Sequence, residues 1–122
     1  MALLNGRPAS GKTTLALHLA AAWSARRERV IVVDASATFE AVRWHEARIR
    51  AGLTSLFRVV PAASERLDRR SLPRLARRSH VIIDGPSGDS ALSIPALLAS
   101  DLAIVPTRPS PAAACRRPRR CR

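Results

Sequence analysis

Hydrophobic residues along this chain gather in short runs separated by longer amphipathic stretches. Residues 29–34 hold four β-branched residues in succession, without alternation, which is typical of a strand buried on both faces of a parallel sheet. Between 12 and 26, apolar residues such as Leu15 and Leu19 recur at helical spacing instead. The pattern predicts strands over 2–4, 29–34, 56–60, 81–84 and 102–105, and helices over 12–26, from Ser36 or Thr38 to about 51, within 64–78 and over 91–100.

Strands and helices alternate throughout, which predicts an α/β fold with a mostly parallel sheet of the P-loop NTPase type and helices on both faces. We expect the strands over 81–84 and 102–105 to be buried and the strand over 56–60 to end before Pro61. Ligands of such sheets bind at the carboxyl ends of the strands. Asp34 and Asp84 each end a predicted strand, so both are expected at that edge.

The chain of 122 residues suits one domain, and its 47% hydrophobic content is enough for a core. Pattern and composition change near the C-terminus, where prolines interrupt a run of Ala, Arg and Cys without periodicity. We therefore predict a nucleotide-binding domain over 1–111 and a disordered tail over 112–122. The cysteines, Cys115 and Cys121, lie in this tail, and their spacing suggests neither a zinc site nor a disulfide framework.

Arginine dominates the charge of the chain. The formal net charge is +12, and without the five arginines of 116–122 it would still be +7. Such a charge attracts nucleic acid or anionic lipid, although a solvated arginine-rich surface explains it equally well. Neither a signal peptide nor an apolar run of about 20 residues, the length that spans a bilayer, is present in the sequence, so we expect a cytoplasmic protein without a membrane partner.

The most specific motif is residues 6–13, which fit the P-loop pattern G-x-x-x-x-G-K-[ST]. Such a loop curls its backbone N–H groups around phosphates; Gly11 allows close approach, Lys12 reaches the β- and γ-phosphates, and Thr13 ligates magnesium. Lys12 is the one lysine of the chain. The alternative is an accidental Gly/Ser loop before a helix. The predicted ATP-binding residues are Gly6, Arg7, Ala9, Ser10, Gly11, Lys12, Thr13 and Thr14.

Two aspartates are the candidate acids. Asp84, at the end of a buried strand, is placed like a Walker B aspartate and is expected to hold Mg²⁺ together with Thr13. Asp34 is expected near the γ-phosphate or its attacking water, on a strand close to the first. It could instead cap the turn that follows it.

These residues resemble the ParA/MinD family of deviant Walker-type ATPases, especially small ParA-like plasmid partition proteins. The resemblance covers about 2–111: residues 5–14 look like the family's first loop, 30–35 like its switch segment, and 81–86 like its Walker B strand. Residues 99–106 are similar to its next strand, and 107–111 to a loop on the nucleotide side.

The resemblance implies an ATP- and Mg²⁺-dependent ATPase of plasmid or chromosome partitioning. Family members form a face-to-face homodimer around two nucleotides, and this dimer binds DNA non-specifically, which implies association with the nucleoid. Hydrolysis is slow and is stimulated by a ParB-like partner protein. Lys12 and Asp34 are the catalytic residues that the resemblance implies here.

The sequence departs from the family pattern, and the departures keep two alternatives open. Arg7 stands at the signature lysine position, Pro8 and Ala9 replace two glycines, and Ser36 replaces a second acid. The family is also usually longer, so a C-terminally truncated domain is expected. A catalytically inactive DNA-binding or interaction fragment is therefore one alternative. The other is a small P-loop kinase whose lid arginines would be Arg69, Arg70, Arg77 and Arg78.

Overall fold

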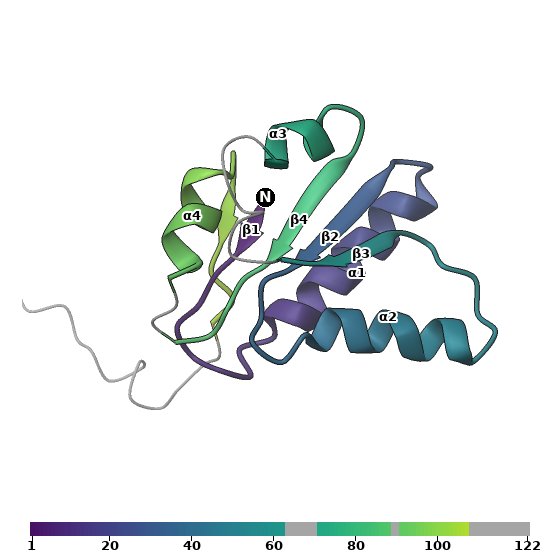
Figure 1. The fold of residues 1–122 in the computed structure, drawn as a ribbon, viewed down its shortest axis with the longest axis horizontal. Coiled ribbons are helices and arrows are strands. Elements are labelled where there is room, and N and C mark those ends of the chain that lie inside the picture. The colour runs from purple at the N-terminus through teal and green to yellow at the C-terminus, as the bar shows by residue number, and fades with distance from the viewer. Residues whose placement is uncertain (63–70, 89–90, 108–122) are drawn as a thin grey trace, which may run out of the picture.

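The structure is a computed structural model that describes residues 1–62, 71–88 and 91–107. Five parallel strands form one sheet in the order β3-β2-β4-β1-β5 (Figure 1). The strands are β1 (Ala2–Leu3), β2 (Val30–Asp34), β3 (Arg58–Pro61), β4 (His80–Asp84) and β5 (Ala103–Ile104), and the helices are α1 (Lys12–Ala25), α2 (Glu40–Arg50), α3 (Ser71–Ala76) and α4 (Ser93–Leu98). The predicted α/β fold with a parallel sheet is confirmed.

Helices cover both faces of the sheet, as predicted. In β2, Val30 and Val32 face the layer formed by α1 and α2, whereas Ile31 and Val33 face the layer of α3 and α4. Every residue of β2 is buried, so the unbroken β-branched run has the central position that its composition predicts. β4 lies between β2 and β1, which the sequence analysis did not foresee. Asp34 therefore pairs in register with Asp84 and not with the first strand.

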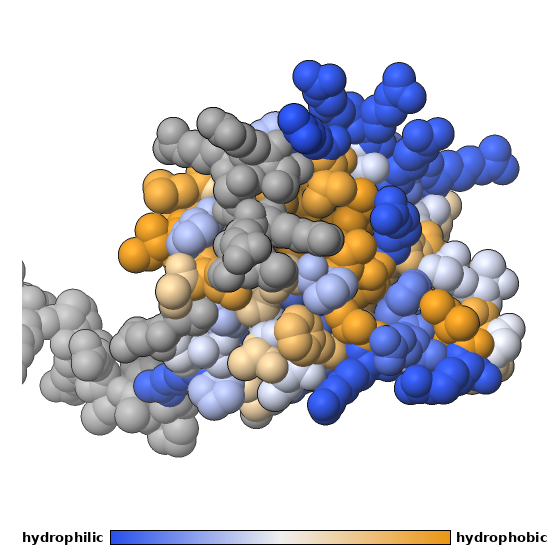
Figure 2. All heavy atoms as spheres, in the orientation of Figure 1, coloured by the Kyte–Doolittle hydropathy of each residue, from blue (hydrophilic) through white to orange (hydrophobic). Residues whose placement is uncertain are grey.

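The predicted burial of the strand over 102–105 is wrong. β5 has two residues and lies at an edge of the sheet, where Leu102 and Val105 are 55% and 58% exposed. Within the described part of the chain, no strand pairs with its outer side. Ile94 and Leu98 of α4 are also exposed, and Figure 2 shows apolar side chains at the surface over this side of the molecule.

β3 forms the other edge and begins and ends later than predicted. It includes Pro61, which pairs in register with Asp34. The next residue, Ala62, donates its N–H to the Asp34 carbonyl over 2.7 Å. The proline nitrogen thus lies on the outer side of the edge strand, where a missing N–H removes no bond of the sheet.

Several boundaries follow local residue chemistry. α2 ends at Arg50, and Gly52 follows it with φ +71°, as expected for a helix stop. Pro95 lies in the first turn of α4, the position that tolerates proline. Within the ranges that the structure describes, no helix is long and apolar enough to cross a membrane. The predicted tail over 112–122 lies outside the described residues, so its disorder stays a prediction.

Gly85 follows β4 directly and is packed so closely against the backbone of Leu3 that there is no room for a side chain. Its N–H donates to the Leu3 carbonyl over 2.9 Å, and a Cβ on Gly85 would lie 2.3 Å from that carbonyl oxygen. Because backbone cannot yield as a flexible side chain does, we expect Gly85→Ala to lower the free energy of unfolding by about 2–3 kcal/mol. Urea unfolding measures this. Gly6→Ala is the control, since a Cβ there meets nothing within 4 Å; equal stability of the two variants would contradict the prediction.

Candidate nucleotide site

The loop from β1 to α1 is fixed at its start by Asn5. The Asn5 side-chain amide donates to the Pro106 carbonyl over 2.6 Å, and its side-chain oxygen accepts the N–H of Arg7 at 2.8 Å. On the other side, Gly88 donates its N–H to the Gly6 carbonyl over 2.8 Å. The loop is therefore held between the segments that follow β4 and β5.

The middle of the loop has an unusual backbone. Ala9 and Gly11 have φ angles of +53° and +89°, and Gly11 is the residue before α1. Nothing lies within 4 Å of a Cβ added to Gly11, so in this structure the left-handed φ is what favours glycine there. The backbone N–H groups of 9–11 have no partner among the described residues. α1 has no acidic residue in its first turn to oppose an anion, and free N–H groups beside a helix N-terminus are an arrangement that suits one.

Lys12 is buried within this loop. Its ammonium lies 3.2 Å and 3.3 Å from the carbonyl oxygens of Asn5 and Arg7, 3.4 Å from Ser10 Oγ, and 2.8 Å from Ser87 Oγ. All four partners are neutral oxygens, and no carboxylate contacts the ammonium directly, while Asp84 lies near enough for the charge of Lys12 to lower the pKa of that carboxyl. The ammonium is therefore available to a negatively charged phosphate.

A cavity of about 390 Å³ opens beside the loop. Six of the predicted ATP-binding residues line it, whereas Gly6, Arg7, Asp34 and Asp84 do not. Arg7 contributes its carbonyl to Lys12 while the residue itself is exposed. The lining residues are Pro8, Ala9, Ser10, Gly11, Lys12, Thr13, Thr14, Ser36, Ala37, Thr38, Glu40, Gly85 and Ser87.

Asp34 is fully buried and engaged in hydrogen bonds. Its carboxylate accepts the Ser36 N–H at 3.0 Å and hydroxyl at 2.6 Å on one oxygen, and the Val42 N–H at 3.0 Å on the other. Phe39, at φ +50°, takes the position before α2 in place of Ser36 or Thr38, but the Ser36 hydroxyl still accepts the first N–H of the helix, from Glu40, at 3.3 Å. Asp34 also fixes the segment that leads into α2, as in the alternative in which it caps the turn that follows it. Its catalytic role stays a prediction.

Asp84 is also fully buried, but its situation differs. Neither carboxylate oxygen has a hydrogen-bond partner in the described structure. Burial is the main cause that raises the pKa of Asp84 to about 6; the nearby Thr13 hydroxyl opposes this rise, and the carboxylate of Asp34 adds to it. A buried carboxylate without donors is costly, and a bound cation would relieve that cost.

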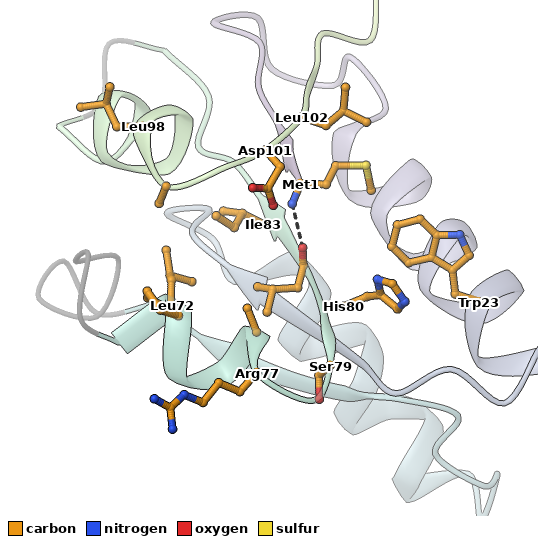
Figure 3. A pocket seen from close by; sticks show the side chains of 14 residues that line it. Met1, Trp23, Leu72, Arg77, Ser79, His80, Ile83, Leu98, Asp101 and Leu102 are labelled. Atoms are coloured by element: carbon orange, nitrogen blue, oxygen red, sulfur yellow. Dashed lines mark hydrogen bonds between the residues drawn. The ribbon is translucent and has the colours of Figure 1, made fainter.

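A larger cavity of about 880 Å³ lies at the opposite end of the strands (Figure 3). It is lined by Met1, His80 and Leu102, at the beginnings of β1, β4 and β5, and mostly by apolar side chains. The Met1 ammonium donates to the Val81 carbonyl there over 3.0 Å. The P-loop and the carboxyl ends of the strands lie at the other end, so this cavity is not the predicted phosphate site.

The kinase alternative receives no support from the described arginines. Arg77 lines the larger cavity, far from the phosphate loop, and Arg78 follows it directly. A lid arginine would have to reach the phosphates. Arg69 and Arg70 lie outside the described residues.

No protein-family model matches the chain, but a comparison with known proteins finds a relative. Over 113 residues the chain is 38% identical to maintenance of carboxysome distribution protein A from Gloeobacter kilaueensis. This chain resembles half of a carboxysome distribution protein. The match covers 91% of the chain and 50% of the relative, so the chain spans about half the length of the carboxysome distribution protein.

Seven residues that line the cavity were not among the predicted binding residues, and two of them contact the predicted ones through their side chains. Ser87 contacts the Lys12 ammonium, and Glu40 lines the cavity and accepts the Thr13 hydroxyl at 3.4 Å. Ser87 follows a predicted strand end by three residues, which was the available signal. Glu40 lies at the start of a helix, where an acidic residue is ordinary, so its spacing gave no signal.

Proposed function

We propose that the chain is a nucleotide-binding domain of a ParA/MinD-family ATPase that positions a large cellular cargo. The observation that carries this proposal is the buried ammonium of Lys12, enclosed by a phosphate-type loop at the start of α1. The sequence resemblance and the similarity to a carboxysome distribution protein support the same class. A carboxysome is the cargo in the relative's name; plasmid or chromosome cargo stays a prediction.

ATP and magnesium fit the site. The unpaired N–H groups of 9–11 and Lys12 would hold the phosphates. The cation would be held by Thr13 and Asp84, since Asp84 is buried without a donor and its neighbour Thr13 lines the cavity. No cluster of three or more His, Cys, Asp or Glu side chains occurs among the described residues, so the phosphates would supply further oxygen ligands. When bound, the cation would neutralise negative charge on the phosphate oxygens.

Slow hydrolysis is the proposed reaction. Lys12 would stabilise charge on the phosphates, and Asp34 would act by fixing the 34–42 segment beside the cavity through Ser36 and Val42. A second copy of the chain and a ParB-like partner protein would complete the cycle, as the family resemblance implies. Because the protein would bind DNA, it would act in the cytoplasm, at the nucleoid.

Non-specific DNA would bind the basic end of the molecule. Figure 2 shows strongly hydrophilic side chains where α1 leads into β2 and α3 leads into β4. Exposed arginines there include Arg29 and the four chosen for the test, Arg26, Arg27, Arg77 and Arg78. Replacing all four with Ala should weaken DNA binding about 10- to 100-fold at low salt and lower the salt slope of binding by up to about 4. Fluorescence anisotropy across a salt series measures both quantities.

The control for that variant is the Arg43→Ala, Arg50→Ala pair, which removes exposed charge from α2. Its smaller charge change should lower the salt slope by less than half as much. Equal salt slopes for the wild type and the four-arginine variant would place the DNA surface elsewhere.

The experiment that tests the proposed function is DNA binding with and without Mg·ATP, in the wild type and in Lys12→Ala. We expect ATP to increase DNA binding by the wild type and to have no effect on the variant. The replacements at Pro8 and Ser36 favour the alternative of an inactive DNA-binding fragment. DNA binding that is strong, salt-dependent and indifferent to ATP would establish that alternative.

A further inference from the structure

The charges that face the phosphate cavity are few. Of its thirteen lining residues, Lys12 and Glu40 are the ones that carry a charged side chain. Lys12 has the sign expected for binding phosphate. Glu40 has the opposite sign and would repel a nucleotide that arrives without a cation.

Glu40 is exposed and lies near the P-loop, where its carboxylate has long contacts to two segments. One carboxylate oxygen accepts the Thr13 hydroxyl at 3.4 Å, and the other accepts the Thr38 hydroxyl at 3.4 Å. The backbone N–H of Glu40 donates to Ser36 Oγ over 3.3 Å. An acid in the first turn of α2 also stabilises the helix by interacting with its dipole, but that role does not require contact with a residue of α1.

A second observation marks the same place as a cation site. The carboxylate of Asp84 is fully buried, has no donor within the described part of the chain, and lies beside the same Thr13 hydroxyl. Thr13 thus lies near two carboxylates from different elements, Asp84 of β4 and Glu40 of α2. Both carboxylates are hard oxygen ligands of the kind that Mg²⁺ and Mn²⁺ prefer.

We propose that Glu40 supplies the second carboxylate of the divalent-cation site, beside Asp84. Glu40 would be a positioning residue: beside Thr13, its carboxylate would help to hold the cation through the cation's surroundings and would not contact the reacting atoms. Ser36 cannot take this role, because its hydroxyl is donated to Asp34 and also accepts the Glu40 N–H. This inference rests on the proposed function.

The test is Glu40→Gln, which keeps the size of the side chain and removes its charge. Mn²⁺ binding to the complex with a non-hydrolysable ATP analogue is measured by electron paramagnetic resonance. We expect the Mn²⁺ affinity to fall about 10-fold or more, as for other residues that orient a metal through a second layer of contacts. In excess EDTA, the same variant should bind the analogue several-fold more tightly, because a repelling charge is gone.

Glu46→Gln is the matched control, since Glu46 is an exposed acid of the same helix that pairs with Arg50 over 3.6 Å. It should change neither affinity. Mn²⁺ affinity within twofold of the wild type in Glu40→Gln, with analogue binding that still depends on Lys12, would overturn this inference alone. A folded wild type that binds no analogue would overturn the proposed function, and this inference with it.

Discussion

Asp84→Asn is expected to make the protein more stable at neutral pH. The buried carboxylate has no hydrogen-bond donor, and burial raises its pKa from 3.8 to about 6. At pH 7 the folded protein therefore contains an ionised group that the unfolded chain would solvate better. An amide avoids the cost of the charge but stays a buried polar group, so we expect a gain of at most about 2–3 kcal/mol in the free energy of unfolding.

The pH dependence follows from the sign of that shift. Because the folded-state pKa lies above the unfolded value, the folded state binds more protons between about pH 4 and pH 6. The contribution of Asp84 to stability is then complete below about pH 4, falls as the pH rises through 6, and stays low above it. Wild type and Asp84→Asn should differ in stability at pH 7 and should converge near pH 4.

Thermal and urea unfolding at several pH values, without nucleotide or metal, measure this difference. A gain of this size raises the melting temperature of a domain of about 100 residues by several degrees per kcal/mol. Glu46→Gln is the control, because Glu46 is an exposed acid of α2 whose ion pair with Arg50 is solvent-exposed, so the change should affect stability little. A variant less stable than the wild type at pH 7 would show that Asp84 has donors after all.

Much of the fold follows from sequence alone. The β-branched run of β2 has no polar face, so a central strand of a parallel sheet was its natural place. The phosphate loop was equally accessible, because its glycines, lysine and threonine occur at fixed spacing before a helix. These features depend on residues that are neighbours in the chain.

The features that the sequence analysis missed depend on strand order and on long-range contacts. The run over 102–105 is apolar enough for a buried strand, yet its burial depends on a neighbour that is absent from the described part of the sheet. Asp34 and Asp84 end their strands alike, and only the contacts show that one accepts three hydrogen bonds and the other none. The approach of Glu40 to Thr13 is set by how α2 packs beside α1, over 27 residues of separation.

Lys12→Ala should abolish ATP binding. The Lys12 ammonium is the one charged donor that lines the phosphate cavity, and its four contacts in the structure are to neutral oxygens. A buried, charge-assisted contact of this kind is worth about 3 kcal/mol or more when its partner is a phosphate, which corresponds to at least about 100-fold in affinity. Lys12→Met, which retains most of the length of the side chain, should lose ATP as well and keeps the test valid if the alanine variant is unstable.

Arg26→Ala provides the matched control, because it removes one positive charge from an exposed position at the far end of α1. It should leave ATP binding unchanged if the local contact, and not the net charge, determines affinity. Circular dichroism and cooperative thermal unfolding establish that each variant is folded.

The most direct measurement of the central claim is therefore a titration of the folded wild type, Lys12→Met and Arg26→Ala with a fluorescent ATP analogue and magnesium. The account predicts saturable binding by the wild type and by Arg26→Ala, and a loss of at least about 100-fold in Lys12→Met. Equal affinity of the wild type and Lys12→Met, or no binding by a folded wild type, would contradict a working phosphate site in this loop.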